Sequence, residues 1–258
     1  MIRNINEKKE TEAIEILMKN VNKLVETKRN DPKVHLLTQN LYESLKILHD
    51  LLIETRKFDK ILTKRYKHYD KLRLENDSFL NEISYQQASV KFHLSIYSTL
   101  SIFNQIIVNI EVPPFLGKPK YHKSVEKSLT IWDEVAIDDI DFLIQTDLLK
   151  ASYIFRTYID HPQQFPVMNW LTTHSKNTLI IYYVPIYSDK PSSTSFNQLM
   201  RFKFKKWNKI YEDEGLNIIM RSVTQSDYLV VPPCEVTFEA VLFYINNISL
   251  YFVNYLSK

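Results

Sequence analysis

The stretch FLNEISYQQASVKFHLSIYSTLSIFNQIIVNI, residues 79–110, decides the fold that the sequence predicts. Its large apolar side chains recur with a spacing of about 3.6 residues or its multiples, which places them on or near one side of an α-helix. No proline interrupts it, and the pair Pro113-Pro114 follows soon after and stops the helix. We therefore predict one long helix within a mainly α-helical protein. The expected buried stripe consists of Phe79, Ile83, Val90, Leu94, Tyr97, Phe103 and Ile107.

Two further helices are expected before this stretch. Residues 4–29 carry apolar side chains at helical spacing. Asp31 then offers an N-cap acceptor and Pro32 suits the first helical position, so a second helix begins there and the two form a hairpin. The charged segment 56–77 is too poor in apolar residues for deep burial and reads as an exposed helical extension. The apolar stripes are Ile14, Leu17, Val21 and Leu24 in the first helix and Val34, Leu37, Leu41, Leu45, Leu48 and Leu52 in the second.

Three more helices are expected in the second half of the chain. A short one covers 122–134 and another ends near Asp160, because Pro162 disfavours a helical backbone at His161. A closing helix over 236–256 is apolar on most sides and should be largely buried.

Residues 165–232 differ from the rest of the chain in composition. The runs TLIIYYVPIY, LNIIMRSV and DYLVV are rich in β-branched and aromatic residues, which favour strands. We predict a small β-containing insertion here. The chain then divides into an N-terminal helical hairpin with a charged helical connection, 1–74, and a helical domain with an insertion, 75–258.

Composition excludes several classes of protein. Only two glycines occur, Gly117 and Gly215. The chain therefore lacks the glycines that a Walker A or Rossmann nucleotide-binding loop requires. The single Cys234, the charged beginning of the chain and apolar runs shorter than about 20 residues predict a cytoplasmic protein with no membrane span. We expect no cofactor and no metal. An acidic group is explained by the helix start that it flanks: Asp133, Glu134, Asp138, Asp139 and Asp141.

The strongest chemical signal is the pair Arg156 and His161, separated by four residues at the end of an apolar helix. A second match of this type, Arg29 and His35, falls in the first hairpin turn, so the spacing alone is not specific. A simpler reading leaves Arg156 on the terminal carbonyls of its own helix and His161 at the start of a turn.

In this setting the sequence resembles the HEPN superfamily of α-helical domains, many of which are metal-independent ribonucleases with an Arg-x(4 to 6)-His motif. The resemblance covers about residues 79 to 256 and implies a HEPN-like helical bundle with Arg156 and His161 as the catalytic pair. It also implies a homodimer in which two protomers bring their pairs into one groove. The family favours Asn, Asp or His directly after the arginine, where this chain has Thr157.

The chemistry of such a pair is direct. Histidine, with an unperturbed pKa of about 6.5, can take the proton from an RNA 2'-hydroxyl or give one to the leaving oxygen. Arginine offers a planar set of donors to the scissile phosphate. Five residues along an unbroken helix would leave the two side chains about 140° apart, so the helix must end between them if they are to converge.

The segment RFKFKKWNK, residues 201–209, is a candidate RNA-binding surface because bases stack on aromatic rings while cations contact phosphates. The alternative is a solvated basic face with its aromatics packed inward. The expected function is an endoribonuclease of toxin or phage-defence type, with RNA and an antitoxin protein as partners; the alternative is a non-catalytic scaffold that binds RNA or a protein. The candidate RNA-binding residues are Arg201, Lys203, Lys205, Lys206, Trp207 and Lys209.

Overall fold

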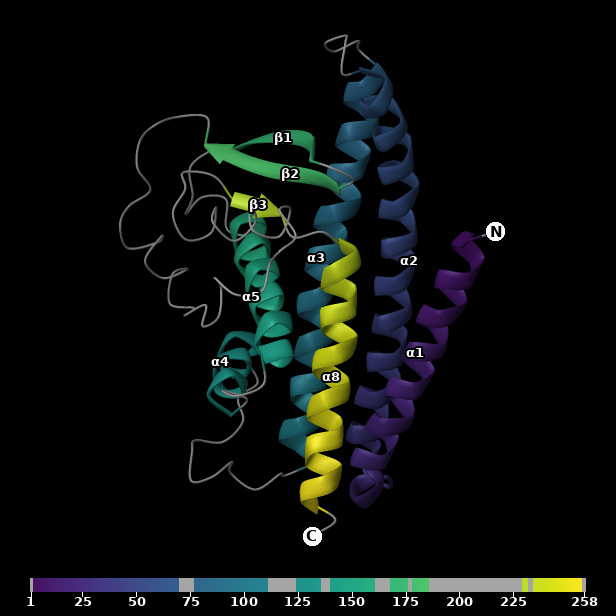
Figure 1. The fold of residues 1–258 in the computed structure, drawn as a ribbon. Coiled ribbons are helices and arrows are strands. Elements are labelled where there is room, and N and C mark those ends of the chain that lie inside the picture. The colour runs from purple at the N-terminus through teal and green to yellow at the C-terminus, as the bar shows by residue number, and fades with distance from the viewer. Residues whose placement is uncertain are drawn as a thin grey trace. The chain divides into compact units, whose positions relative to one another are not determined.

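The computed structural model confirms a mainly α-helical protein (Figure 1). It describes residues 2–69, 77–110, 124–135, 140–160, 168–175, 178–185, 229–231 and 234–256, with side chains over 7–58, 84–110, 124–131, 145–153, 155–157 and 234–254. The helices are α1 (Ile2–Leu24), a 3-10 turn η1 (Glu26–Lys28), α2 (Pro32–Tyr69), α3 (Asp77–Asn109), α4 (Val125–Val135), α5 (Ile140–Asp160) and α8 (Cys234–Leu256).

The chain divides into two compact units, each assembled from separate segments. The first unit comprises Met1–His49, Ser95–Thr146 and Phe238–Lys258. The second unit comprises Asp50–Leu94 and Asp147–Thr237. The boundaries between them fall inside α2, α3, α5 and α8, so each unit is described by itself. The division into 1–74 and 75–258 stays a prediction.

The α1–α2 hairpin belongs to the first unit and follows from its turn residues. The side chain of Asp31 accepts hydrogen bonds from the backbone N–H of Lys33 at 2.8 Å and of Val34 at 3.4 Å. These bonds satisfy two of the amides that the first turn of α2 leaves without an intrahelical partner. Pro32 is the first residue of α2, where it sacrifices no helical bond. The predicted cap is confirmed, and α1 runs alongside the first half of α2 (Figure 1).

The core of the first unit is built from the predicted stripes of α1 and α2 together with α3 and α8. Phe103 of α3 meets Tyr244 of α8 edge to face, with ring centroids 6.5 Å apart. Each fully buried large apolar side chain contributes about 1.5 to 3 kcal/mol of transfer free energy, so this layer dominates the stability of the unit. The buried members include Ile14, Leu17, Val21 and Leu24 of α1 and Val34, Leu41, Leu45 and Leu48 of α2.

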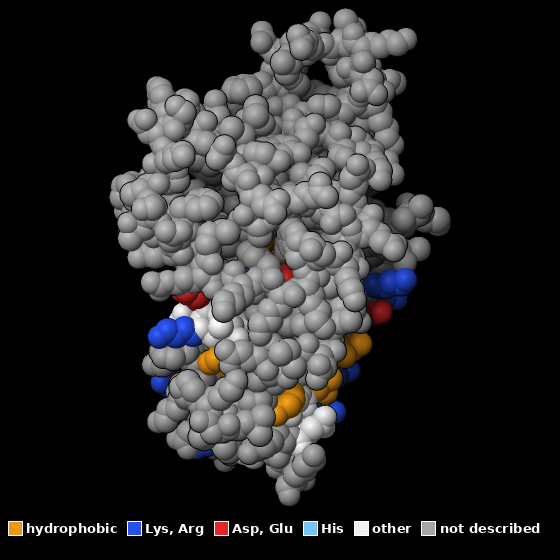
Figure 2. Space-filling view, turned by 60° about the vertical axis from the view of Figure 1, so that its left-hand side comes forward, with side chains coloured by type: hydrophobic (Ala, Val, Ile, Leu, Met, Phe, Trp, Pro, Cys, Tyr) orange, Lys and Arg blue, Asp and Glu red, His pale blue; other side chains and the backbone are white. Residues whose placement is uncertain are grey.

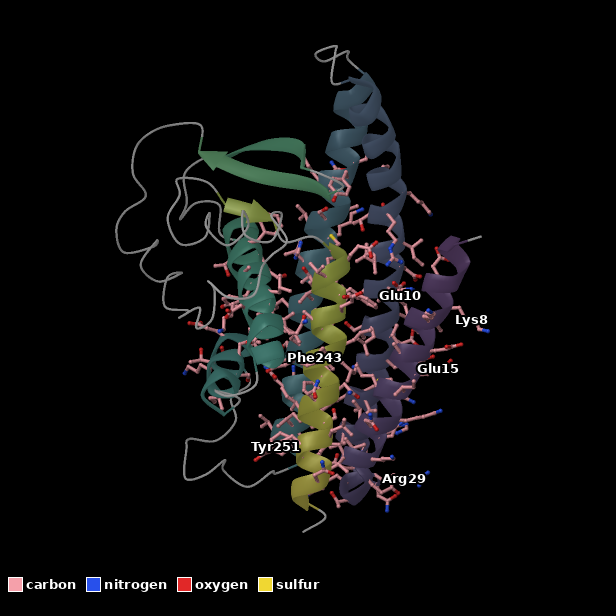
Figure 3. All side chains as sticks on the ribbon, viewed as in Figure 1. Lys8, Glu10, Glu15, Arg29, Phe243 and Tyr251 are labelled. Atoms are coloured by element: carbon pink, nitrogen blue, oxygen red, sulfur yellow. The ribbon has the colours of Figure 1, made fainter. Side chains whose placement is uncertain are left out.

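Polar side chains also join the helices of the first unit. Glu10 of α1 lies on the side that faces α2, where its carboxylate is 3.0 Å from Nε2 of His49 (Figure 3). His49 in turn stacks on Phe238 of α8, with centroids 5.8 Å apart. The Nδ2 amide of Asn20 donates to Oδ1 of Asn246 at 2.8 Å and links α1 to α8. These contacts fix the position of α1 more narrowly than apolar packing alone.

The buried side of α3 differs in part from its predicted stripe. Phe103 and Ile107 are buried as expected, whereas Val90, Leu94 and Tyr97 are only half-buried. The prediction was wrong for these three because the inner face of α3 is rotated from the predicted stripe: Phe92, Ile96 and Ile106 are buried instead, together with the small polar residues Ser89 and Thr99. One row of buried positions recurs at intervals of four and three residues: Tyr85, Ser89, Phe92, Ile96, Thr99, Phe103, Ile106 and Ile110. Ala88, His93, Leu100, Asn104 and Ile107 beside this row are also buried.

The second unit contains three antiparallel strands in the order β1-β2-β3. They are β1 (Met168–Ser175), β2 (Thr178–Pro185) and β3 (Leu229–Val231). The β1–β2 register runs from Met168 opposite Pro185 to Ser175 opposite Thr178. The rest of the segment 165–232 lies outside the described residues, so its role as an insertion in a HEPN-like bundle stays a prediction.

Helix α8 is the one helix of the described ranges that is long and apolar enough, over Cys234–Asn254, to cross a membrane. Half of that window is buried inside the protein, and a core helix of a soluble protein has the same length and composition. The predicted absence of a membrane span stays a prediction.

Candidate functional site

Of the predicted catalytic pair, the structure places Arg156 and not His161. Arg156 lies about one turn from the C-terminal end of α5, and its side chain is half-buried. His161 lies outside the described residues. So do the candidate RNA-binding residues Arg201, Lys203, Lys205, Lys206, Trp207 and Lys209.

Helix α5 ends at Asp160, directly before His161 and Pro162, as the sequence predicts. The proline ring disfavours the helical conformation at the residue before it, which accounts for a helix end between the arginine and the histidine. The break that a converging pair requires is therefore in place, and the convergence itself stays a prediction.

The surroundings of α5 change along its length. Every residue from Thr146 to Ser152 is buried. Since successive residues of a helix point about 100° apart, seven buried residues in a row mean that α5 is enclosed on all sides there. Beyond Ser152 the helix opens, because Tyr153, Arg156 and Thr157 are all half-buried. Arg156 thus lies where α5 passes from an enclosed to a partly open environment.

A serine and a histidine tie α5 to α3 in the second unit. Nδ1 of His93 lies 2.7 Å from Oγ of Ser152, and both residues are buried. The imidazole also meets Phe155 edge to face, with centroids 5.2 Å apart. A hydrogen-bonded Ser–His pair can serve as an activated nucleophile when substrate reaches it. These two are at most 1% exposed, so the pair holds the two helices together.

A buried ion pair lies in the enclosed part of the same helix. Nζ of Lys150 is 2.9 Å from Oδ1 of Asp147, with side chains only 1% and 4% exposed. The two residues are three apart, so they lie on one side of α5. Neither was a candidate from the sequence. The signal that could have found them is a pair of opposite charges at helical spacing inside the apolar run LIQTDLLKAS.

Thr157 follows the candidate arginine, and its hydroxyl is directed at its own helix. Oγ1 of Thr157 donates to the backbone carbonyl of Tyr153 at 2.8 Å. This intrahelical bond is common for threonine inside a helix. The hydroxyl proton is therefore committed to the backbone, and the residue after Arg156 offers acceptor capacity rather than a free donor.

The start of α8 is fastened to α2 and α3 in the second unit. Arg56 of α2 makes a bidentate ion pair with Glu235, with Nε–Oε1 and Nη2–Oε2 distances of 2.5 and 2.9 Å. Cys234 is buried, with its Sγ 3.8 Å from Oγ of Ser89 on α3. The cysteine is thus part of the packing at this helix start.

Other surface features of the described ranges are scattered. The large apolar residues that reach the surface are Ile16, Leu36, Ile47, Leu250 and Tyr251. On the face drawn in Figure 2, apolar side chains appear in separate small patches. Isolated residues of this kind are normal on a soluble domain. Among the residues that the structure describes, no group of three or more His, Cys, Asp or Glu side chains could hold a metal ion.

Comparison of the chain with protein-family models, with curated proteins and with solved structures gives no match. The described residues define the class as a mainly α-helical protein. Its candidate site is the partly open end of α5, where Arg156 lies.

Proposed function

We propose that the protein is a metal-independent endoribonuclease of the HEPN kind, acting in a toxin–antitoxin or phage-defence system. Arg156 binds the scissile phosphate, and His161 serves as general acid and base. The observation that carries the proposal is the position of Arg156: it is half-buried at the opening end of α5, and that helix ends just before His161. A fully enclosed arginine could not contact RNA.

The reaction requires only groups that the pair supplies. His161 removes the proton of the 2'-hydroxyl, and the 2'-oxygen attacks the adjacent phosphorus. The bond from phosphorus to the 5'-oxygen breaks, and the protonated imidazole of His161, now the general acid, gives its proton to that oxygen. The products are a 2',3'-cyclic phosphate and a 5'-hydroxyl end. The guanidinium of Arg156 stabilises the charge that develops on the phosphoryl oxygens.

The remaining parts of the proposal concern partners and finer fold. A HEPN-like bundle that contains the strands in an insertion over 165–232 would place the basic segment 201–209 beside the cleavage site. Two protomers would join their pairs in one groove, an antitoxin protein would restrain the activity, and the protein would act in the cytoplasm.

The test is RNA cleavage in the presence of EDTA. Wild-type protein should cleave labelled single-stranded RNA, and Arg156→Ala and His161→Ala should each abolish cleavage. The chain offers a matched control, because Arg29 and His35 have nearly the same spacing and are both exposed, Arg29 in the hairpin turn and His35 in the first turn of α2. Arg29→Ala and His35→Ala should cleave as the wild type does. Cleavage retained by either Arg156→Ala or His161→Ala would refute the assignment.

A non-catalytic scaffold that binds RNA or a partner protein is the second candidate. The hydroxyl of Thr157 favours it, since this hydroxyl bonds to the carbonyl of Tyr153 and supplies no donor beside the arginine. A scaffold would retain RNA without cutting it. Charge reversal at Lys203 and Lys206 should then weaken retention, whereas Arg156→Ala should leave it unchanged.

A further inference from the structure

We infer that His93 and Ser152 are positioning residues. Their hydrogen bond fixes how the last turns of α5 are rotated about the helix axis and where they lie along it, and thereby fixes the position of Arg156. The inference rests on the proposed function for its catalytic consequence. Its structural part, the control of the end of α5, stands apart from that function.

The hydrogen bond between His93 and Ser152 is short, and it lies in a buried, largely apolar environment. Nδ1 of His93 and Oγ of Ser152 are 2.7 Å apart, and neither residue reaches solvent appreciably. Phe92 and Phe155 present ring edges or faces to the imidazole at 5.4 and 5.2 Å. Water cannot replace either partner in this apolar setting, so loss of the bond leaves a buried polar group unsatisfied.

Ser152 lies at the point where α5 stops being enclosed. All residues from Thr146 to Ser152 are buried, and beyond Ser152 only Phe155 is buried among the residues of α5 whose side chains the structure describes. Both of these buried residues contact the same histidine, one by a hydrogen bond and one by an aromatic edge. The end of α5 is therefore held to α3 through His93.

The link to Arg156 follows from helical geometry. Ser152 and Arg156 are four residues apart, so they lie on nearly the same side of α5, one turn from each other. A small rotation of the helix about its axis moves a long side chain at that position by more than the backbone. In enzymes a displacement of about 1 Å at a catalytic group can cost about 100-fold in rate.

A buried apolar pair would pack here without choosing one register, because apolar contacts tolerate sliding. A histidine and a serine on facing helices can form their hydrogen bond in one alignment only. Selection of one register in this way is the best-supported role of buried polar groups. The pair thus selects a single setting of α5 against α3.

The experiment compares three variants by amide hydrogen exchange and by kinetics. Ser152→Ala and His93→Phe remove the bond, whereas His93→Asn keeps a polar atom attached to Cγ, where Nδ1 stands. Ser249→Ala is the matched control, because Ser249 is equally buried and its hydroxyl bonds only to the carbonyl of Ile245 in its own helix.

The first readout requires no activity. Ser152→Ala and His93→Phe should accelerate exchange of the amides of 153–160 while those of α3 keep their protection, His93→Asn should restore slow exchange, and Ser249→Ala should not change it. Unaltered exchange at 153–160, or equal acceleration throughout the second unit, would overturn the inference. This result holds even if wild-type protein cleaves no RNA, which would refute the proposed function alone.

The second readout applies when wild-type protein cleaves RNA. Ser152→Ala and His93→Phe should lower kcat by about 10- to 100-fold with little change in KM, since RNA still binds and only the arginine is misplaced. His93→Asn should recover most of the rate. Unchanged kcat in Ser152→Ala, or a rate in His93→Asn as low as in His93→Phe, would contradict the positioning role.

Discussion

Lys150 and Asp147 form an ion pair at 2.9 Å within one turn of α5, and the protein encloses both side chains. Burying charges costs free energy that the mutual attraction offsets only while both partners are present. The intact ion pair therefore adds little to the stability of the fold. Removal of either partner alone is strongly destabilising, because the other charge stays buried.

Asp147→Ala should lower the free energy of unfolding by about 3 to 5 kcal/mol, because it leaves the Lys150 ammonium buried without its carboxylate. Denaturant titration measures the loss. The chain supplies an exposed counterpart, Glu43 and Lys46, with the same spacing and the same 2.9 Å distance. Glu43→Ala should cost no more than about 1 kcal/mol. Similar losses in the two variants would contradict the buried assignment.

The N-cap of α2 gives a second prediction. Asp31→Ala should lower the free energy of unfolding by about 1 kcal/mol, because two backbone amides of the first turn lose their acceptor. Asp31→Asn keeps an acceptor oxygen and should cost much less. Thermal or chemical denaturation of both variants tests this, and an Asn variant as weak as the Ala variant would show that charge rather than capping is at work.

The core of the first unit gives a third prediction. Phe103 is fully buried against Tyr244, so Phe103→Ala should lower the free energy of unfolding by about 3 to 5 kcal/mol. Ile16 on α1 is 57% exposed. Ile16→Ala should therefore change the free energy of unfolding by less than about 0.5 kcal/mol. A large effect of Ile16→Ala would indicate that a second copy or another partner covers this position.

Much of the fold was predictable because its signals are local. The Asp31-Pro32 sequence marks the start of α2, and Pro162 marks the end of α5. The inner face of α3 was predicted only in part, since the roles of Ser89 and Thr99 depend on partners far away in the sequence. Thr99, for example, bonds to Ser44 at 2.7 Å.

The candidate site was predictable to a smaller extent. The motif identified Arg156, and the structure shows the opening of α5 around it. Asp147, Lys150 and Ser152 escaped prediction because charged and hydroxyl side chains usually indicate exposure, and their burial depends on partners that only the folded chain supplies. His161 and the basic segment 201–209 lie outside the described residues.

The most direct test of the central claim is a double-mutant cycle on the single-turnover rate of RNA cleavage in EDTA. Arg156→Ala and His161→Ala should each lower the rate by about 100-fold or more. The variant that carries both should be scarcely slower than the weaker single variant, because the two groups act on one phosphate as a unit. Independent, multiplicative losses, or a wild-type protein that leaves RNA intact, would contradict the account.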